Sequence, residues 1–181
     1  MEKQPPFSSR LFITSDNDLK NYLKPLKKAY SLVGNGDFIM NYDMILSVSR
    51  SQIKNKKVAN ILNTLSSKSH ETEGHWVLLT VDRNNVCILV DSLSSVLCTN
   101  KEFRNTISTF CQIHKLQRMV WNVKTQSSTS QSCGFQVLYF THFFSNNNTK
   151  NLLNLQTFFK SHTLHENEKF ILKKAYALCS F

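Results

Sequence analysis

Three residues that could together perform nucleophilic catalysis, His75, Asp91 and Cys133, stand at the edges of apolar segments. His75 precedes "WVLLTVD", Asp91 follows "VCILV", and Cys133 opens "CGFQVLYF". A thiol becomes a strong nucleophile when an imidazole takes its proton, and a carboxylate can orient that imidazole. Each residue type alone is more typical of a structural position. Their order and their places at the ends of segments together favour a cysteine nucleophile served by a His–Asp pair.

The segments around His75 and Asp91 predict a β-hairpin. Both are short and rich in β-branched residues, and "DRNN" joins them as a four-residue turn. Antiparallel strands place the start of one beside the end of the other, so we expect the two side chains to lie side by side despite sixteen intervening steps of the chain. Both strands are apolar on both faces, which predicts a central place in a sheet.

The stretch "KTQSSTSQSCGFQVLYF", residues 124–140, predicts a polar loop followed by a buried helix that begins at Cys133. The unpaired N–H groups of a first helical turn favour a thiolate over a thiol. The backbone N–H of Cys133 and an upstream glutamine, Gln126 or Gln131, could donate to a developing oxyanion. Gly134 would let the substrate backbone approach closely.

The remaining chain predicts helices on both sides of the hairpin. Helical spacing covers 14–32, with an N-cap at Thr14 or Ser15 and a kink at Pro25, and also 58–68, 101–116, 133–144 and 151–162. Residues 118–123 predict a third strand. This order predicts an α+β fold in a single domain, 1–181, with a small central mixed β-sheet flanked by helices.

Charge is the second functional signal. Lys and Arg number 22 against 12 Asp and Glu, and the first sixty residues hold ten basic and five acidic groups. Such an excess suits a polyanion such as DNA, because neutralised phosphates release counterions, although a basic soluble surface has the same composition. The candidate DNA-binding residues lie in "KPLKK" and "KNKK": Lys27, Lys28, Lys54, Lys56 and Lys57.

Composition also sets expectations about compartment. The start of the chain has no apolar segment of signal-peptide length, and the apolar runs are too short to span a bilayer, so we expect an intracellular, non-membrane protein, most simply a monomer. Five cysteines are an odd number, which favours reduced thiols over a disulfide framework.

One Cys–His pair and one His–His pair are candidate metal ligands. Cys111 with His114, and His162 with His165, have spacings that zinc can use. The pairs fall on separate predicted helices without further ligand spacing. We therefore expect no metal, and no cofactor that the chemistry itself requires.

These residues resemble a known clan of cysteine endopeptidases, the one that includes adenain, the adenovirus maturation protease, and the SUMO-specific proteases. His75-Trp76, Asp91, Gln126 and Cys133-Gly134 match the clan pattern in order, and the likeness is dense over 58–140. The seven positions from Gln126 to Cys133 resemble adenain, as SUMO-specific proteases usually have six. The pair Asp91-Ser92 is instead more similar to the SUMO-protease branch.

The resemblance implies a role for each matched residue. Cys133 would be the nucleophile, His75 the general base and then acid, and Asp91 the group that orients His75. Gln126, preferred over Gln131 because of its spacing, would form the oxyanion hole with the Cys133 amide. Trp76 would pack at the rim of the substrate site.

The resemblance also implies a biological setting. Adenain-like enzymes hydrolyse peptide bonds after small residues, often Gly, in viral structural precursor proteins, at the site of virus assembly and in the virion. DNA and a short viral peptide serve them as activators. The open alternatives are a protease that removes a ubiquitin-like modifier, an acetyltransferase using the same three residues, and a non-catalytic, basic DNA-binding protein.

Overall fold

A five-stranded mixed sheet forms the centre of the protein in the computed structural model, which describes residues 15–33, 36–70, 74–128 and 130–179. The strands lie in sequence order and are β1 (Ile39–Asn41), β2 (Val58–Asn63), β3 (Trp76–Val81), β4 (Val86–Val90) and β5 (Gln117–Val120). The two outer pairs, β1–β2 and β4–β5, are parallel, whereas β2–β3 and β3–β4 are antiparallel. The predicted α+β class with a mixed sheet is confirmed.

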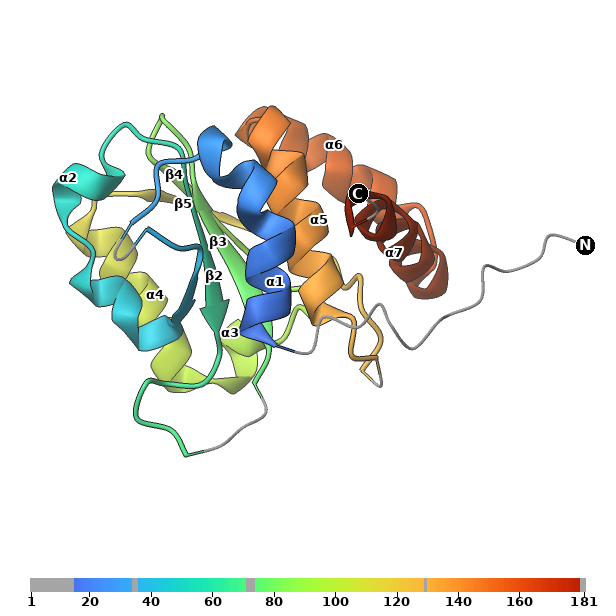
Figure 1. The fold of residues 1–181 in the computed structure, drawn as a ribbon, viewed down its shortest axis with the longest axis horizontal. Helices are drawn as coiled ribbons and strands as arrows, with labels where there is room; N and C mark the ends of the chain where they lie inside the picture. The colour runs from blue at the N-terminus through green and yellow to red at the C-terminus, as the bar shows by residue number, and fades with distance from the viewer. Residues whose placement is uncertain (1–14, 34–35, 71–73, 129, 180–181) are drawn as a thin grey trace, which may run out of the picture.

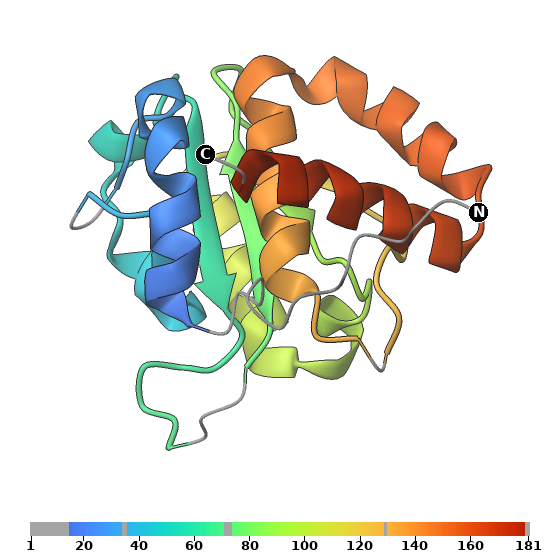
Figure 2. The same ribbon diagram turned by 45° about the vertical axis from the view of Figure 1, so that its right-hand side comes forward.

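Helices cover both faces of this sheet (Figures 1 and 2). They are α1 (Asp16–Leu23), η1 (Lys24–Ala29), η2 (Tyr42–Ser47), α2 (Arg50–Ile53), α3 (Val96–Thr99), α4 (Lys101–Ile113), α5 (Cys133–Asn146), α6 (Thr149–Lys160) and α7 (Leu164–Cys179). One core lies between the sheet and α1, α5, α6 and α7, and the other between the sheet and η2, α2 and α4. Alternate side chains of β3 belong to the two cores: Leu78 packs in the first core, and Val77 and Leu79 pack in the second.

The predicted hairpin is confirmed, and its strands are the third and fourth of five. Leu78 pairs with Val90 and Val81 with Cys87, and residues 82–85 form the turn between the two strands. Asp82 Oδ1 accepts hydrogen bonds from the amides of Asn84 and Val86, which fixes the turn. This register places the start of β3 and the end of β4 at the same edge of the sheet.

The helix predicted over 58–68 is wrong, because Val58–Asn63 is strand β2. Its apolar residues fit a helical stripe, but the first five positions of the segment are all buried, as in a strand covered on both faces. A short apolar run does not distinguish a buried strand from a buried helix by spacing alone. Pairing with β1 on one side and β3 on the other decides the outcome.

The N-terminal helix prediction is confirmed with a change at Pro25. Ser15, one of the two expected N-caps, accepts a hydrogen bond from the Asp18 amide, and Thr14 lies outside the described residues. The α-helix ends at Leu23, and η1, with Pro25 in its first turn, continues as a 3₁₀ helix. Proline lacks the N–H that the α-helical pattern would require there.

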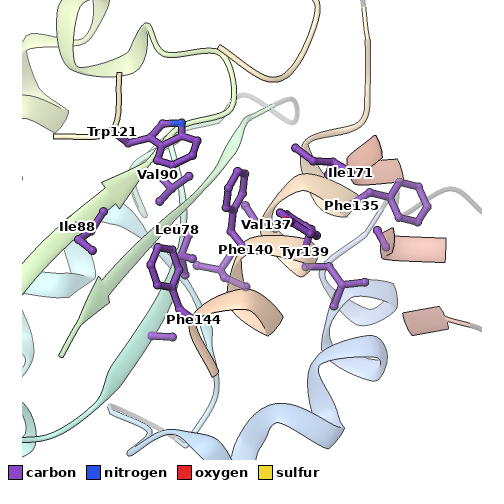
Figure 3. Packing of buried hydrophobic residues seen from close by; sticks show 14 of the residues in the cluster. Leu78, Ile88, Val90, Trp121, Phe135, Val137, Tyr139, Phe140, Phe144 and Ile171 are labelled. Carbon is purple, nitrogen blue, oxygen red and sulfur yellow. The ribbon is translucent and has the colours of Figure 1, made fainter. Parts of the chain in front are cut away.

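Helix α5 is the buried helix expected from Cys133 onward. Phe140 and Phe144 face the sheet residues Leu78 and Ile88, and Trp121 packs against Phe140 with ring centroids 5.1 Å apart (Figure 3). Burial of this helix holds its first turn, which carries Cys133, at a fixed place beside the edge of the sheet.

Helix α7 was not predicted from the sequence. It crosses α5 (Figure 2), Tyr176 meets Phe135 with ring centroids 4.9 Å apart, and Ile171 and Ala175 are fully buried. Asn167 anchors its start, because its side-chain Nδ2 donates a 2.7 Å hydrogen bond to the carbonyl of Phe159 in α6. The part of the chain that the structure describes contains no helix long and apolar enough to cross a membrane.

Candidate active site

His75 and Asp91 meet at one edge of the sheet, as the hairpin predicts. His75 immediately precedes β3 and Asp91 immediately follows β4, and His75 Nε2 lies 2.7 Å from Asp91 Oδ1. Only 18% of the histidine side chain and 7% of the aspartate side chain are exposed. Because Nε2 faces the carboxylate, Nδ1 is the ring nitrogen left for the Cys133 sulfur.

The Asp91 carboxylate is held by backbone donors as well as by His75. Oδ1 accepts from the Leu93 amide at 3.0 Å, and Oδ2 accepts from the Ser95 and Val96 amides at 2.9 and 2.8 Å. Burial alone raises the pKa of Asp91, but hydrogen bonds from His75 and Val96 outweigh it and lower that pKa below its ordinary value. Asp91 therefore remains ionised and its orientation is fixed.

Cys133 is the first residue of α5 and is partly exposed, while its sulfur accepts a hydrogen bond from the His75 side chain. Burial raises the pKa of the Cys133 thiol, but the bonds from His75 and the Trp76 backbone lower it more. The Gly134 backbone adds to this effect. The resulting pKa lies below that of an ordinary thiol, which favours the thiolate.

The imidazole shows the complementary shift. Burial lowers the pKa of His75, yet hydrogen bonds to Asp91 and Cys133 outweigh this and raise it to about 9. His75 is consequently protonated at neutral pH, between a carboxylate and a sulfur that favours its own anion. The arrangement can form an imidazolium–thiolate pair.

The backbone before β3 fixes where His75 sits. The His75 amide donates to Thr64 Oγ1 at 3.0 Å, and the Thr64 amide donates to the His75 carbonyl at 2.9 Å. Gly74 passes so close to Asn63 that a Cβ at position 74 would lie 2.1 Å from Asn63 Oδ1. A side chain at position 74 would fit only if the Asn63 side chain, whose Oδ1 accepts from the Leu65 amide, moved away.

Gln126 is buried in the loop that leads into α5, and Ser92, the residue after Asp91, holds it. Its backbone amide donates to the Ser92 carbonyl at 3.0 Å, and its Oε1 accepts from Ser92 Oγ at 2.6 Å. Its Nε2 donates to the Ser130 carbonyl at 2.8 Å, and a carboxamide nitrogen has a second hydrogen to offer. The competing Gln131 is exposed. Ser92 and Gln126 are 34 positions apart, so no local pattern in the sequence predicts this contact.

The two predicted substrate-binding residues flank the nucleophile. The Trp76 backbone forms a hydrogen bond with the Cys133 sulfur. The half-buried Trp76 side chain packs at the edge of the core that includes α5. The Trp76 indole Nε1 is buried without a hydrogen-bond partner among the described residues. Gly134 is buried in the first turn of α5.

The predicted DNA-binding residues do not all gather at one place. Lys28, Lys56 and Lys57 line a concavity of about 320 Å³ together with Arg83, which the sequence analysis missed. Lys27 and Lys54 are not among its lining residues. Arg83 belongs to the turn between β3 and β4, so the concavity lies at the opposite end of β3 from His75, about 20 Å away along a six-residue strand.

Among the basic residues that line the concavity, Lys57 is partly buried and bonded to α5. Its Nζ donates a 2.9 Å hydrogen bond to the carbonyl of Ser145 in α5. Burial lowers the pKa of Lys57, and the nearby charge of Arg83 lowers it further. The more exposed cations of the concavity, such as Lys56 and Arg83, are better placed to meet a phosphate.

The two pairs with metal-ligand spacing in the sequence have other surroundings. Cys111 forms a side-chain hydrogen bond with Cys87, and the His114 ring packs against Phe110 at an interplanar angle of 54°, with ring centroids 4.7 Å apart. His165 is exposed on the other side of the sheet, on α7. Within the described ranges, no three His, Cys, Asp or Glu side chains gather as a metal site requires.

Comparison of the chain with protein-family models and with curated proteins finds no match. The family assignment therefore stays a prediction based on the residues themselves. What the geometry adds is the contact of His75 with both Asp91 and Cys133 at the N-terminus of a helix.

Proposed function

We propose that this protein is a cysteine peptidase that hydrolyses peptide bonds through a thioester. The observation that carries the proposal is the imidazole of His75, bonded through Nε2 to Asp91 at 2.7 Å and also hydrogen-bonded to the Cys133 sulfur. A nucleophile, a base and an orienting carboxylate in hydrogen-bond contact are the parts that acyl transfer requires.

The proposed reaction begins with attack of the Cys133 thiolate on the carbonyl carbon of the scissile bond. The oxyanion that forms accepts hydrogen bonds from the Cys133 amide and from the second Nε2 hydrogen of Gln126. Protonated His75 gives its proton to the leaving amine as the C–N bond breaks, which leaves a thioester. Neutral His75 then takes a proton from water, hydroxide attacks the thioester, and the acid product leaves as the ion pair re-forms.

Within this class, we propose an adenain-like maturation protease that cleaves viral structural precursor proteins after small residues of the Gly type. The support is the ordered match of His75-Trp76, Asp91, Gln126 and Cys133-Gly134 to that pattern. The buried position of Gln126 and the exposure of Gln131 favour the adenain-like spacing of the oxyanion donor. Assembly sites and virions are the locations that this function implies.

DNA is the proposed activator. The support is the overall charge of +10 and the concavity lined by Lys28, Lys56, Lys57 and Arg83. Because the concavity lies a strand's length from His75, bound DNA would leave the peptide site open. A peptide activator stays a prediction from the resemblance alone.

The decisive experiment compares wild-type protein with Cys133→Ala on a fluorogenic peptide ending in Gly-Gly-aminomethylcoumarin and on candidate virion precursors. We expect hydrolysis by wild type and a loss of at least about 10³-fold in Cys133→Ala, because the variant lacks the sulfur that His75 activates. Cys98→Ala is the matched control, since Cys98 is an exposed thiol on α3. Cleavage that persists in Cys133→Ala would refute the assignment.

A deconjugating protease is the second candidate, favoured by the pair Asp91-Ser92, which resembles the SUMO-protease branch. A ubiquitin-like modifier with a C-terminal electrophile would then label Cys133 far faster than a short Gly-Gly electrophile does. Equal labelling rates favour the maturation protease.

Two other outcomes would indicate the remaining alternatives. An acetylated acceptor formed from acetyl-coenzyme A, without peptide cleavage, would indicate the acetyltransferase. DNA binding without any labelling of Cys133 would indicate the non-catalytic DNA-binding protein.

A further inference from the structure

Three successive residues of the loop before α5 are fastened to three different elements. Thr125 Oγ1 donates to the Gln136 side chain in α5 at 2.9 Å, and Gln136 Nε2 returns a 3.0 Å bond to the Thr125 carbonyl. Gln126 is held by Ser92 after β4. The Ser127 amide donates a 2.6 Å hydrogen bond to Glu168 Oε2 in α7.

Glu168 is firmly placed by its own surroundings. It lies in the first turns of α7, next to Asn167, which is 3% exposed and bonded to the Phe159 carbonyl, and one turn before the fully buried Ile171. Within the described ranges no Lys, Arg or His forms an ion pair with Glu168, and its carboxylate instead accepts from a backbone amide. A carboxylate accepting from an N–H forms one of the stronger hydrogen bonds in proteins.

The contact acts on the peptide unit next to Gln126. The Ser127 N–H belongs to the bond that joins Gln126 to Ser127, so its direction sets the plane of that peptide. Ser92 fixes Gln126 from the preceding side through the Gln126 amide and Oε1. With the Ser127 amide released, the peptide can rotate and carry the carboxamide away from the oxyanion.

We propose that Glu168 is a positioning residue that orients Gln126 by holding the Ser127 amide, so that α7 completes the oxyanion hole. This role rests on the proposed cysteine peptidase function. Oxyanion donors contribute only when they are already aligned with the developing charge, and loss of one such donor costs about 10²–10³ in kcat. A Gln126 carboxamide that is present but poorly oriented should cost part of this factor in kcat.

The test compares Glu168→Ala with Glu168→Gln on the Gly-Gly fluorogenic peptide. We expect Glu168→Ala to lower kcat about 10-fold or more with KM within about 2-fold, because the oxyanion exists only after attack. Glu168→Gln should stay within about 3-fold of wild type, because its amide oxygen accepts the same N–H. Glu166→Ala is the matched control, an exposed acid on the same helix that bonds Thr163.

Two further measurements separate positioning from loss of fold. Amide hydrogen exchange at Ser127 should accelerate in Glu168→Ala and not in Glu166→Ala, whether or not substrate is present. Alkylation of Cys133 by iodoacetamide should keep its wild-type rate in all three variants, because the thiolate depends on His75 and needs no oxyanion hole.

The outcomes are distinct. Unchanged kcat and unchanged Ser127 exchange in Glu168→Ala overturn the proposal, and so does an equal loss of kcat in Glu168→Gln and Glu168→Ala. Slower Cys133 alkylation in Glu168→Ala also overturns it, since the defect would then reach the ion pair. A wild-type protein without Cys133-dependent hydrolysis refutes the peptidase function itself and this role with it.

Discussion

Ser92 Oγ donates a 2.6 Å hydrogen bond to Gln126 Oε1, and the Ser92 carbonyl accepts from the Gln126 amide at 3.0 Å. The residue directly after Asp91 therefore positions the proposed oxyanion donor. One short segment at the end of β4 thus connects the group that orients His75 with the group that would stabilise the transition state.

Ser92→Ala should weaken catalysis because it removes the hydrogen bond to Gln126 Oε1. The Gln126 Oε1, which is buried, loses its donor, so we expect kcat to fall about 10-fold and the free energy of unfolding to fall by about 1–3 kcal/mol. Steady-state kinetics and urea unfolding measure the two effects. Ser95→Ala is the control, because Ser95 contacts Asp91 through its backbone amide. Equal kinetics in the two variants would count against a role for Ser92 in holding Gln126.

Asp91→Asn should move the alkaline limit of activity to lower pH. In wild type, hydrolysis falls as pH rises through the His75 pKa of about 9, because neutral imidazole cannot protonate the leaving amine. The carboxylate is one of the groups that raise this pKa, so its loss shifts the limit toward 6.5. We also expect kcat to drop about 100-fold as the imidazole loses its orientation.

The measurement is the pH profile of kcat/KM for both proteins, with the alkylation rate of exposed Cys98 as an internal control for thiol chemistry. An alkaline limit that stays at the same pH in Asp91→Asn would show that His75 is not the group that titrates.

Gly74→Ala should disturb the approach to β3. Its Cβ would lie 2.1 Å from Asn63 Oδ1, so either the Asn63 side chain or the backbone at position 74 must move. Overpacking of this kind costs about 1–3 kcal/mol of stability. Because His75 is the next residue, kcat should fall as well. The double variant Asn63→Ala/Gly74→Ala removes the clashing oxygen and should recover part of both losses. Thermal unfolding and kinetics of the three variants decide, and a Gly74→Ala protein identical to wild type would contradict the close contact.

Lys56→Ala/Arg83→Ala should weaken DNA binding and its dependence on salt. Both residues line the concavity at the β3–β4 turn. Each phosphate contact contributes about 0.9 to the slope of log affinity against log salt, so the slope should fall by about 2. Fluorescence anisotropy with labelled duplex DNA at several salt concentrations gives the slope.

Lys54→Ala, an exposed lysine that is not among the residues lining the concavity, is the matched control for this double variant. A similar loss of affinity in the control would mean that binding depends on net charge and not on the concavity.

The sequence was sufficient where the relevant geometry is local. The hairpin follows from two apolar runs and a four-residue turn, and it brings His75 to Asp91 because antiparallel strands share an edge. The start of α5 at Cys133 follows from the change from polar to apolar residues. The sequence was insufficient at 58–63, where strand β2 has the spacing of a helix, and pairing with β1 and β3 decides between the two.

By itself, the sequence determined which side chains could form the nucleophile, the base and the orienting carboxylate, and that the last two meet. Only the tertiary structure decided which residues hold Gln126 and Ser127, in the loop before α5. Ser92 and Gln126 are 34 positions apart, and Ser127 and Glu168 are 41 apart. Such contacts form because β4 and α7 pack around α5. The packing of segments that are distant in the chain leaves no periodic pattern in the sequence from which it could be predicted.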